Sequence, residues 1–419
     1  MPTLHIIDPL LVSRGGHYLS QHVALWNLCQ KKGFGMVSYC QTGFDSEQMP
    51  AGVRLEKVFG KTASASLQGH YCIDLASSNM DCYEELKSID HTVFAADDIV
   101  FLTSLTASRA IAYGKWLREI IDELPSRIGL YAITSSEVDD TLGRQMRRNG
   151  IEISDASFQQ LDEVVVPNEV KRSMFRYLFD SIPAKQVERF RVFYEEPFPN
   201  RAFLETCKHD SLKFIYTHSM YSGQPKPQSK SGENLTIAYL GSGGVGDVSK
   251  GQHLIAAVVG EINARSNNVS FIVQMGNARE AGYISEEQKS QLGLLAGHDN
   301  LALYTGLLDC ETYCDLIESA DIVLLPYGPR YRHIMSGIFD ECLFLGKVAV
   351  IPERCKMSLW MERHNLDCPT FKSWDVEGVC LAVEDAINNI AHYQTQFAEA
   401  QKIYRQRWER YNPIEAFNH

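Results

Sequence analysis

DIVLLPYGPRYRHIMSGIFDECLFLGKVAVIPE, residues 321–353, is the stretch of sequence that decides the fold. It contains two short apolar runs, at 321–328 and 347–353, and a helical pattern between them that begins near Ser336. Short apolar runs separated by amphipathic helices are typical of parallel strands whose sheet is covered on both faces. The stretch therefore predicts an α/β fold.

The same alternation extends from this stretch toward both ends of the chain. Ahead of it lie strand candidates at 235–241, 269–276 and 301–306, with a helix over 251–265. The N-terminal half repeats the pattern with helices over 18–32 and 107–123 and with strand candidates at 4–8, 35–40, 98–102, 128–133 and 162–167. Each half therefore predicts one doubly wound sheet.

The domain boundaries follow from length and from a break in this alternation. A chain of 419 residues is long for a single hydrophobic core. The polar stretch QPKPQSKSGEN at 224–234 marks a linker, which we place at 201–234. We predict a Rossmann-like domain over 1–200, a second over 235–400, and a C-terminal helix over 401–419 that packs back on the first domain.

Composition excludes several classes of protein. A net charge of −12 argues against a general nucleic-acid binder, which needs a concentrated Lys and Arg surface. No apolar run reaches the roughly 18 to 20 residues of a membrane span, and the N-terminus lacks a signal-peptide pattern. The eleven cysteines have no metal-ligand spacing, since Cys310 and Cys314 lack a second pair. We expect no metal, buried reduced thiols and a cytoplasmic location.

Glycine-rich loops follow the first strand candidate of each half. Gly15, Gly16 and His17 open the first helix, where a tight turn with His17 as a cap is the alternative to ligand binding. The second loop contains Gly243 and Gly244 and leads to Lys250 at a helix start. Its spacing is not the dinucleotide GxGxxG pattern, so it disfavours NAD. An ammonium beside helix amides suits a diphosphate, although Lys250 is alternatively an ordinary solvated lysine.

The deciding stretch itself carries polar residues next to a strand end. Glu341 interrupts the apolar run FDECLFLG about one helical turn beyond Gly337, and a purely structural role for such an acid is unusual. It can accept hydrogen bonds from ligand hydroxyls. The other candidates in this stretch are Tyr327, Arg330, Arg332, His333, Ser336 and Ile338.

Residues 235–355 resemble the retaining GT-B glycosyltransferases of family GT4. The matching pieces are Gly241 with Lys250-Gly251, ADIVLLPY at 320–327 and SGIFDECLFLGKVAVIP at 336–352. The resemblance implies two Rossmann-like domains that face each other across a cleft, with the nucleotide-sugar site in the C-terminal one. It assigns the donor diphosphate to Lys250 and the 336–338 turn.

The resemblance also assigns the donor ribose to Glu341 and places Gly15-Gly16 opposite the diphosphate. Two residues depart from the family pattern. His333 replaces the first motif glutamate, and Val245 stands where an arginine usually lies. Arg330 or Arg332 can supply the missing charge or bind an acidic donor sugar; a solvated basic turn is the alternative.

The resulting expectation is a metal-independent, retaining glycosyltransferase with no cofactor, in which His333 lies near the donor sugar. It transfers a hexosyl or related group to a glycan, lipid-linked glycan or other hydroxyl acceptor, in work such as polysaccharide biosynthesis. The alternatives are a sugar-nucleotide epimerase or hydrolase on the same fold, and a non-catalytic nucleotide- or glycan-binding subunit.

Two further features of the N-terminal half allow alternatives. Thr103 and Ser104 follow a strand and either face the acceptor or cap a helix. The basic aromatic helix KRSMFRYL at 171–178 either lies on a membrane surface or packs its aromatic rings in the core.

Overall fold

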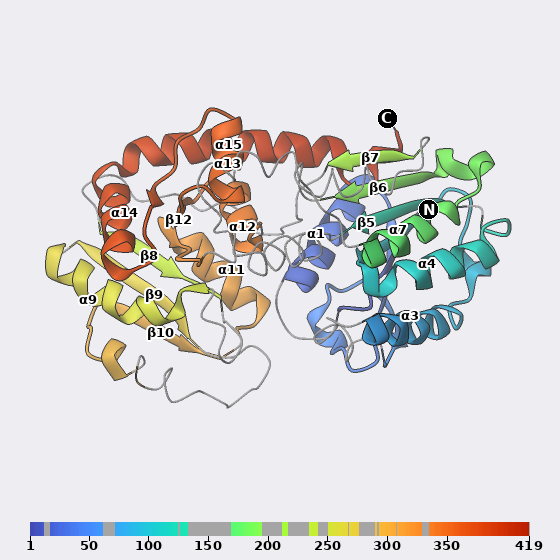
Figure 1. The fold of residues 1–419 in the computed structure, drawn as a ribbon, viewed down its shortest axis with the longest axis horizontal. Coiled ribbons are helices and arrows are strands. Elements are labelled where there is room, and N and C mark those ends of the chain that lie inside the picture. The colour runs from blue at the N-terminus through green and yellow to red at the C-terminus, as the bar shows by residue number, and fades with distance from the viewer. Residues whose placement is uncertain are drawn as a thin grey trace. The chain divides into compact units, whose positions relative to one another are not determined.

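The computed structural model describes residues 1–11, 17–61, 72–124, 126–132, 169–194, 212–216, 234–241, 250–266, 268–275, 290, 293–306, 308–328 and 335–418. The chain divides into two compact units. Unit 1 comprises Met1–Ser222 and Arg407–His419, and unit 2 comprises Gly223–Gln406. Each unit contains one parallel sheet (Figure 1).

The sheet of unit 1 has seven strands in the order β3-β2-β1-β4-β5-β6-β7, and every described pair is parallel. The chain moves outward from β1 in one direction and then resumes at β4 in the other, so the order reverses between β1 and β4. Their bounds are β1 Thr3–Ile7, β2 Gly35–Gln41, β3 Arg54–Phe59, β4 Ile99–Leu105, β5 Arg127–Ala132, β6 Phe190–Tyr194 and β7 Lys213–Tyr216.

Helices cover both faces of this sheet. Connections between parallel strands are right-handed, so the helix after β1 and the helices after β3, β4 and β5 lie on opposite faces, because successive strands are added in opposite directions from the centre of the sheet. Helix α1 therefore covers one face, and α3, α4 and α7 cover the other. The main core lies between the sheet and the second group, where Trp116 of α4 and Phe175 of α7 are fully buried. The helices are α1 His17–Lys32, α3 Cys72–Leu86, α4 Ala107–Ile120 and α7 Glu169–Asp180, with short 3-10 helices η1 Ser46–Gln48, η2 His91–Val93, η3 Ala184–Arg189 and η7 Glu415–Phe417.

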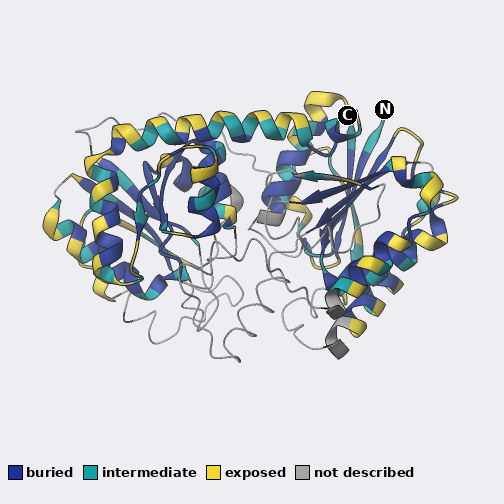
Figure 2. Ribbon diagram, turned by 45° about the horizontal axis from the view of Figure 1, so that its top comes forward, coloured by how far each residue is buried: buried dark blue, intermediate teal, exposed yellow. Residues whose placement is uncertain are grey.

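The sheet of unit 2 has six strands in the order β10-β9-β8-β11-β12-β13, again all parallel, and its order reverses between β8 and β11. The central strands of both sheets are largely buried, as Figure 2 shows by colour, whereas the edge strands β3 and β10 are partly exposed. The strands of unit 2 are β8 Leu235–Tyr239, β9 Val269–Met275, β10 Leu301–Thr305, β11 Ile322–Leu324, β12 Val348–Pro352 and β13 Thr370–Phe371.

The helices of unit 2 follow the strands in the same alternating manner. The long last helix, α15, begins in unit 2, and its final residues belong to unit 1. The bounds are η5 Gln252–Leu254, α9 Ile255–Arg265, α11 Cys310–Ser319, α12 Gly337–Leu345, α13 Lys356–Arg363, α14 Val376–Asn388 and α15 Ile390–Tyr411.

The predicted α/β fold with two doubly wound sheets is confirmed, but the predicted linker is partly wrong. Residues 213–216 inside the segment 201–234 form β7, the edge strand of unit 1. This edge strand has only four residues, KFIY, and an apolar run of that length does not by itself indicate a strand. The strand candidate at 162–167 lies outside the described residues.

The helix at 171–178 resolves into the second of its two alternatives. It forms most of α7, in which Phe175, Leu178 and Phe179 are fully buried in the core of unit 1. The apolar face of α7 therefore packs in the core of unit 1. Among the described residues, no helix is long and apolar enough to cross a membrane.

Candidate active site

Ligands of open α/β sheets bind in a crevice beyond the carboxyl ends of the strands where the strand order reverses, and in unit 2 this reversal lies between β8 and β11. Gly241 lies just beyond β8 with a φ of 121°, and its amide donates to Gln274 Oε1 at 3.0 Å. A Cβ added at Gly241 would lie 3.8 Å from Lys250 Nζ and 3.0 Å from Ile338 Cδ1. The fold therefore brings Ile338 to the same place as Gly241 and Lys250, which precede it in sequence by almost 90 residues or more.

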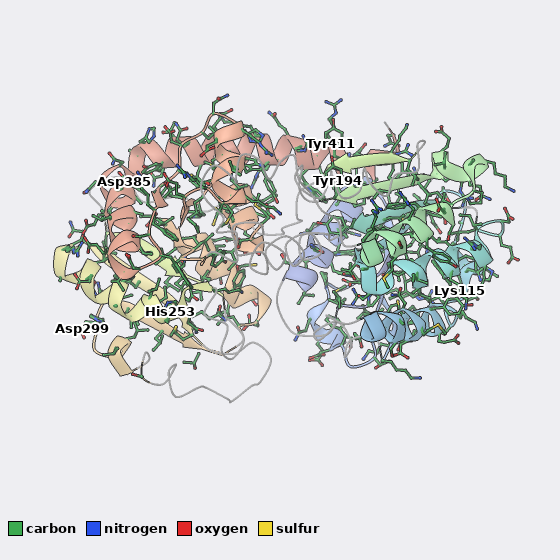
Figure 3. All side chains as sticks on the ribbon, in the orientation of Figure 1. Lys115, Tyr194, His253, Asp299, Asp385 and Tyr411 are labelled. Carbon is green, nitrogen blue, oxygen red and sulfur yellow. The ribbon has the colours of Figure 1, made fainter. Side chains whose placement is uncertain are left out.

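Gly251 is a glycine because its backbone passes close to the end of the neighbouring strand. Its φ is 71°, and an added Cβ would lie only 1.9 Å from the carbonyl oxygen of Pro326. The same carbonyl accepts a hydrogen bond from Trp374 Nε1 at 2.9 Å, and Trp374 packs edge-on against His253 of η5, which is labelled in Figure 3. These contacts fix the start of η5 and hence the position of Lys250.

Helix α12 begins at this crevice with Ser336 as its N-cap residue. The hydroxyl of Ser336 makes no capping bond and instead contacts Tyr327 Oη at 3.0 Å. The amides of Gly337 and Ile338 at the helix N-terminus are left without a side-chain cap. Such amides, together with the helix dipole, favour an anion.

Glu341 follows one turn later in α12 and is 7% exposed. Burial raises its pKa to about 8, and a hydrogen bond donated by Tyr313 to Glu341 Oε2 opposes that rise. Burial therefore favours the protonated form of this carboxyl in the unliganded protein. Tyr313, on α11, was not identified from the sequence, because the contact joins two helices whose relative packing no local pattern reports.

Several predicted residues lie outside the described part of the chain, and their roles stay predictions. His17 is the first residue of α1. The residues outside the description are Gly15, Gly16, Gly243, Gly244, Arg330, Arg332 and His333. In the described ranges, no cluster of three or more His, Cys, Asp or Glu side chains is arranged to hold a metal ion.

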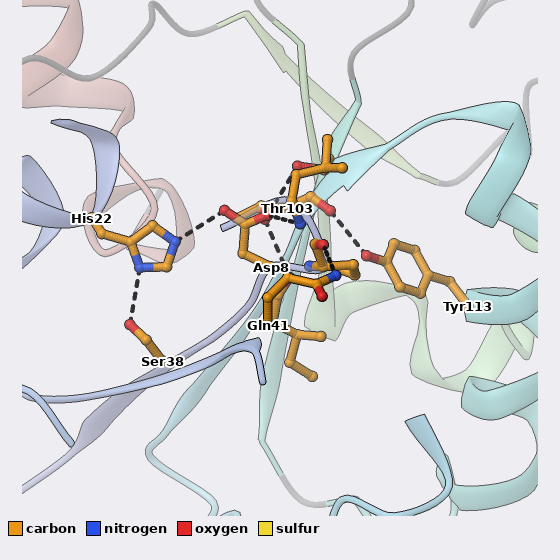
Figure 4. Close-up of polar contacts among 10 residues, drawn as sticks. Asp8, His22, Ser38, Gln41, Thr103 and Tyr113 are labelled. Carbon is orange, nitrogen blue, oxygen red and sulfur yellow. Dashed lines mark hydrogen bonds and ion pairs between the residues drawn. The ribbon is translucent and has the colours of Figure 1, made fainter. Parts of the chain in front are cut away.

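A second polar group lies at the carboxyl edge of the sheet in unit 1, next to the reversal between β1 and β4 (Figure 4). Asp8, directly after β1, is fully buried and contacts His22 Nε2 at 3.0 Å. His22 Nδ1 in turn contacts Ser38 Oγ at 2.9 Å, and Ser104 Oγ donates to Asp8 Oδ1 at 3.2 Å.

Burial acts to raise the pKa of Asp8, but hydrogen bonds from His22 and the amide of Leu10, with the charge of His22, outweigh it and lower the pKa. The carboxylate is therefore ionised. Neither Thr103 nor Ser104 caps α4, because the N-cap residue of that helix is Thr106, and a position facing the acceptor stays a prediction. Both are buried, Thr103 Oγ1 donates to the carbonyl of Ile7, and Ser104 binds Asp8.

Known proteins resemble this chain in structure and not in sequence. No protein-family model and no curated protein matches the sequence. Among solved structures, trehalose-6-phosphate synthase OtsA has a TM-score of 0.59 at 11% identity, with 99% of this chain and 97% of that chain covered. HepE from Anabaena, in complex with UDP and glucose, has a TM-score of 0.54 at 12% identity, with 100% and 98% covered. The fold is GT-B.

A third similar structure, a putative UDP-N-acetylglucosamine 2-epimerase from Listeria monocytogenes, has a TM-score of 0.55 at 12% identity and covers 94% of this chain and 90% of that chain. At such identities the likeness concerns the architecture alone. The chemistry of this GT-B protein must therefore be argued from its own residues.

Proposed function

We propose that this GT-B protein is a nucleotide-sugar-dependent glycosyltransferase with its donor site in unit 2. The observation that supports the proposal most directly is the convergence of Lys250 Nζ, Gly241 and the N-terminal turn of α12 at the strand-order reversal. An ammonium and uncapped helix amides together offset the negative charge that grows on a departing nucleoside diphosphate.

The other residues complete this assignment. Glu341 lies one turn along α12, where it can form hydrogen bonds with the ribose hydroxyls. Tyr327 contacts Ser336 and so holds the turn that binds the diphosphate. The GT4-like pattern supports transfer with retention, in which the leaving phosphate accepts the proton of the acceptor hydroxyl. On this mechanism neither a metal ion nor a side-chain base is required.

Unit 1 holds the acceptor, a glycan or another hydroxyl compound, in the proposed reaction. The reaction is proposed to take place in the cytoplasm. A lipid-linked acceptor is compatible with this reaction. Membrane contact by residues 171–178, one of two alternatives for that segment, is not supported, because Phe175 and Phe179 of α7 lie in the core.

Replacing Glu341 with Ala tests the donor site. Loss of hydrogen bonds to a group of this kind costs about 1.5–3 kcal/mol, so donor affinity should fall about 10- to 100-fold. The measurement is isothermal titration calorimetry with the nucleotide sugar that most raises the Tm in a screen of UDP-, GDP-, ADP-, dTDP- and CMP-sugars. Glu311→Ala, at an exposed position on α11, is the matched control. Wild-type affinity in a folded E341A variant would refute the assignment.

The similarity to an epimerase fold supports a second candidate, turnover of the nucleotide sugar without an acceptor. Incubation with the nucleotide sugar alone separates the two. Epimerised or hydrolysed sugar would favour the second candidate, whereas product that forms only with an acceptor supports transfer.

A further inference from the structure

Arg109, in the first turn of α4, is a buried arginine that the proposed donor site does not use. It is 1% exposed, and its Nη1 donates to the carbonyl of Ser104 at 3.1 Å and to Thr106 Oγ1 at 3.2 Å. Its Nε and Nη2 atoms are buried without a hydrogen-bond partner among the described residues. A buried guanidinium with two unpaired donors is unfavourable unless an acceptor such as water or an anion completes it.

The two unpaired donors have the geometry that recognises an oxyanion. Nε–H and the adjacent Nη2–H lie on one edge of the planar guanidinium and form a two-pronged donor that matches two oxygens of a phosphate or carboxylate. No described carboxylate forms an ion pair with Arg109. The nearby carboxylate of Asp8 is instead bound to His22 and Ser104.

The backbone next to Arg109 adds further donors. Thr106 is the N-cap residue of the 14-residue helix α4 but makes no side-chain capping bond, because its hydroxyl contacts Ser108 Oγ and Arg109 Nη1. The first amides of α4 are thus left without a side-chain cap beside the guanidinium. Nη1 links the guanidinium to this helix N-terminus through Thr106, and both groups favour a negative charge.

The position of this group in the fold matches that of a ligand site. Ser104 and Thr106 lie at the carboxyl end of β4, next to the reversal between β1 and β4. Ser104 has a φ of 56°, and the pairing of β4 with β5 is irregular between Leu102 and Leu105. Backbone held in a sparsely populated conformation at such an edge is common at binding sites. The bond between Ser104 Oγ and Asp8 maintains it.

We propose that Arg109 and the N-terminus of α4 form an anion subsite in unit 1 that binds a phosphate or carboxylate group of the acceptor. The assignment of the anion to the acceptor rests on the proposed glycosyltransferase function, whereas the anion subsite itself does not. It predicts that the preferred acceptor is a sugar phosphate or an acidic sugar rather than a neutral one.

The probe for the subsite is inorganic phosphate, and the readout is the Tm of the full chain at constant ionic strength with chloride as the balancing salt. All variants carry Lys250→Ala, so that phosphate bound at the proposed donor site does not contribute. Phosphate should raise the Tm of the Lys250→Ala protein in a saturable manner. The added changes are Arg109→Gln, which removes the charge, and Arg109→Lys, which keeps the charge but not the two-pronged donor.

Arg109→Gln should abolish the phosphate-dependent rise, and Arg109→Lys should weaken the apparent affinity at least about ten-fold. Arg118→Lys, on the same helix and in contact with Tyr177 and Ser181, should retain it. The subsite would be overturned if phosphate did not raise the Tm of the Lys250→Ala protein. It would also be overturned if the Arg109 variants showed the same rise in Tm as the Lys250→Ala protein. If Arg109→Gln does not fold, Arg109→Lys alone decides.

Three sugars then distinguish the source of the anion. Glucose 6-phosphate should bind in an Arg109-dependent manner if the subsite takes a phosphate, and glucuronate if it takes a carboxylate. Glucose should show no dependence on Arg109. Binding of UDP-sugars is measured on the same Arg109 variants in the Lys250 wild-type background. If UDP-sugars do not bind while the phosphate response is intact, the result contradicts the proposed function but not the anion subsite.

Discussion

Gly251 is the position in the candidate donor site at which the backbone leaves no room for a side chain. An alanine there places its Cβ 1.9 Å from the carbonyl oxygen of Pro326, in a left-handed conformation that alone costs about 1–2 kcal/mol. Gly251→Ala should therefore lower the free energy of unfolding of unit 2 by at least about 2 kcal/mol and weaken nucleotide binding, because η5 and Lys250 are displaced.

Urea unfolding followed by fluorescence measures the stability change, with Gly260→Ala as the control. Gly260 lies inside α9, has an ordinary φ and has nothing within 4 Å of an added Cβ, so this change should stabilise the protein by about 0.5–1 kcal/mol. Equal effects of the two substitutions would contradict the close contact at Pro326.

Tyr313 should control the protonation of Glu341. Its hydrogen bond favours the ionised carboxylate, so Tyr313→Phe should raise the pKa of Glu341 from about 8 by about one to two units. The folded-state pKa is above the ordinary value of 4.5, so the folded protein binds the proton more tightly, and stability is lost as pH rises from about 4.5 through about 8. In Tyr313→Phe this loss should continue to higher pH.

The measurement is the Tm of the unliganded protein against pH, relative to Glu341→Gln, which has no carboxyl to titrate. In the Glu341→Gln background, Tyr313→Phe should have no further effect on the pH dependence. A Tyr313→Phe profile that superimposes on that of the wild type would show that the hydrogen bond does not set this pKa.

At the scale of single residues, the sequence predicted Glu341 and Lys250 but not their partners. A glutamate within FDECLFLG is conspicuous because its own neighbours are apolar. Tyr313 and Arg109 are not conspicuous in the sequence, because tyrosine and arginine are common in amphipathic helices. Their burial depends on the packing of other elements around them. The local sequence pattern indicates the chemistry of a residue, whereas tertiary packing determines which side chains it contacts.

Strands illustrate the same limit at the scale of elements. The sequence predicts the central strands β1, β4, β8, β11 and β12 because both faces are buried and most of their residues are apolar. β6 was missed because Arg191 interrupts FRVFY. That arginine is nevertheless buried, and its guanidinium is satisfied by the carbonyls of Glu188, Phe190 and Ala416.

The Asp8–His22 pair joins strand β1 to helix α1 in unit 1, and its loss should destabilise that unit. Asp8→Asn removes the ionised partner of a fully buried pair, which costs about 3–5 kcal/mol. Because the folded-state pKa of Asp8 is lowered, its contribution is present above the unfolded value of about 3.8 and is lost as pH falls through the folded-state pKa. The difference in stability between Asp8→Asn and wild type should therefore be full at pH 7 and shrink below about pH 4.

Thermal unfolding at a series of pH values measures this difference. Asp97→Asn, at an exposed position just before β4, should match the wild type throughout. A difference between Asp8→Asn and wild type that does not depend on pH would show that the charge of Asp8 is not what stabilises the unit.

At the scale of the whole molecule, the last residues of the chain complete unit 1 although they follow unit 2 in sequence. Glu415 forms an ion pair with Lys32 of α1, and Arg191 donates to the carbonyl of Ala416 at 3.1 Å. The guanidinium groups of Arg127 and Arg191 lie over the ring of Phe417 at 5.7 and 5.2 Å from its centroid. Each such contact is worth about 0.5–1 kcal/mol or more.

Deletion of residues 407–419 should therefore destabilise unit 1 and leave unit 2 unchanged. Hydrogen exchange followed by mass spectrometry should show faster exchange in peptides from β5, η3 and β6, because their carbonyl and cation contacts are lost, and unchanged exchange in β8, β11 and β12. Phe417→Ala, which removes only the aromatic ring, should give a smaller change in the same peptides. Faster exchange confined to unit 2 would instead place the C-terminal segment with the proposed donor domain, and α15 would then not carry the chain back to unit 1.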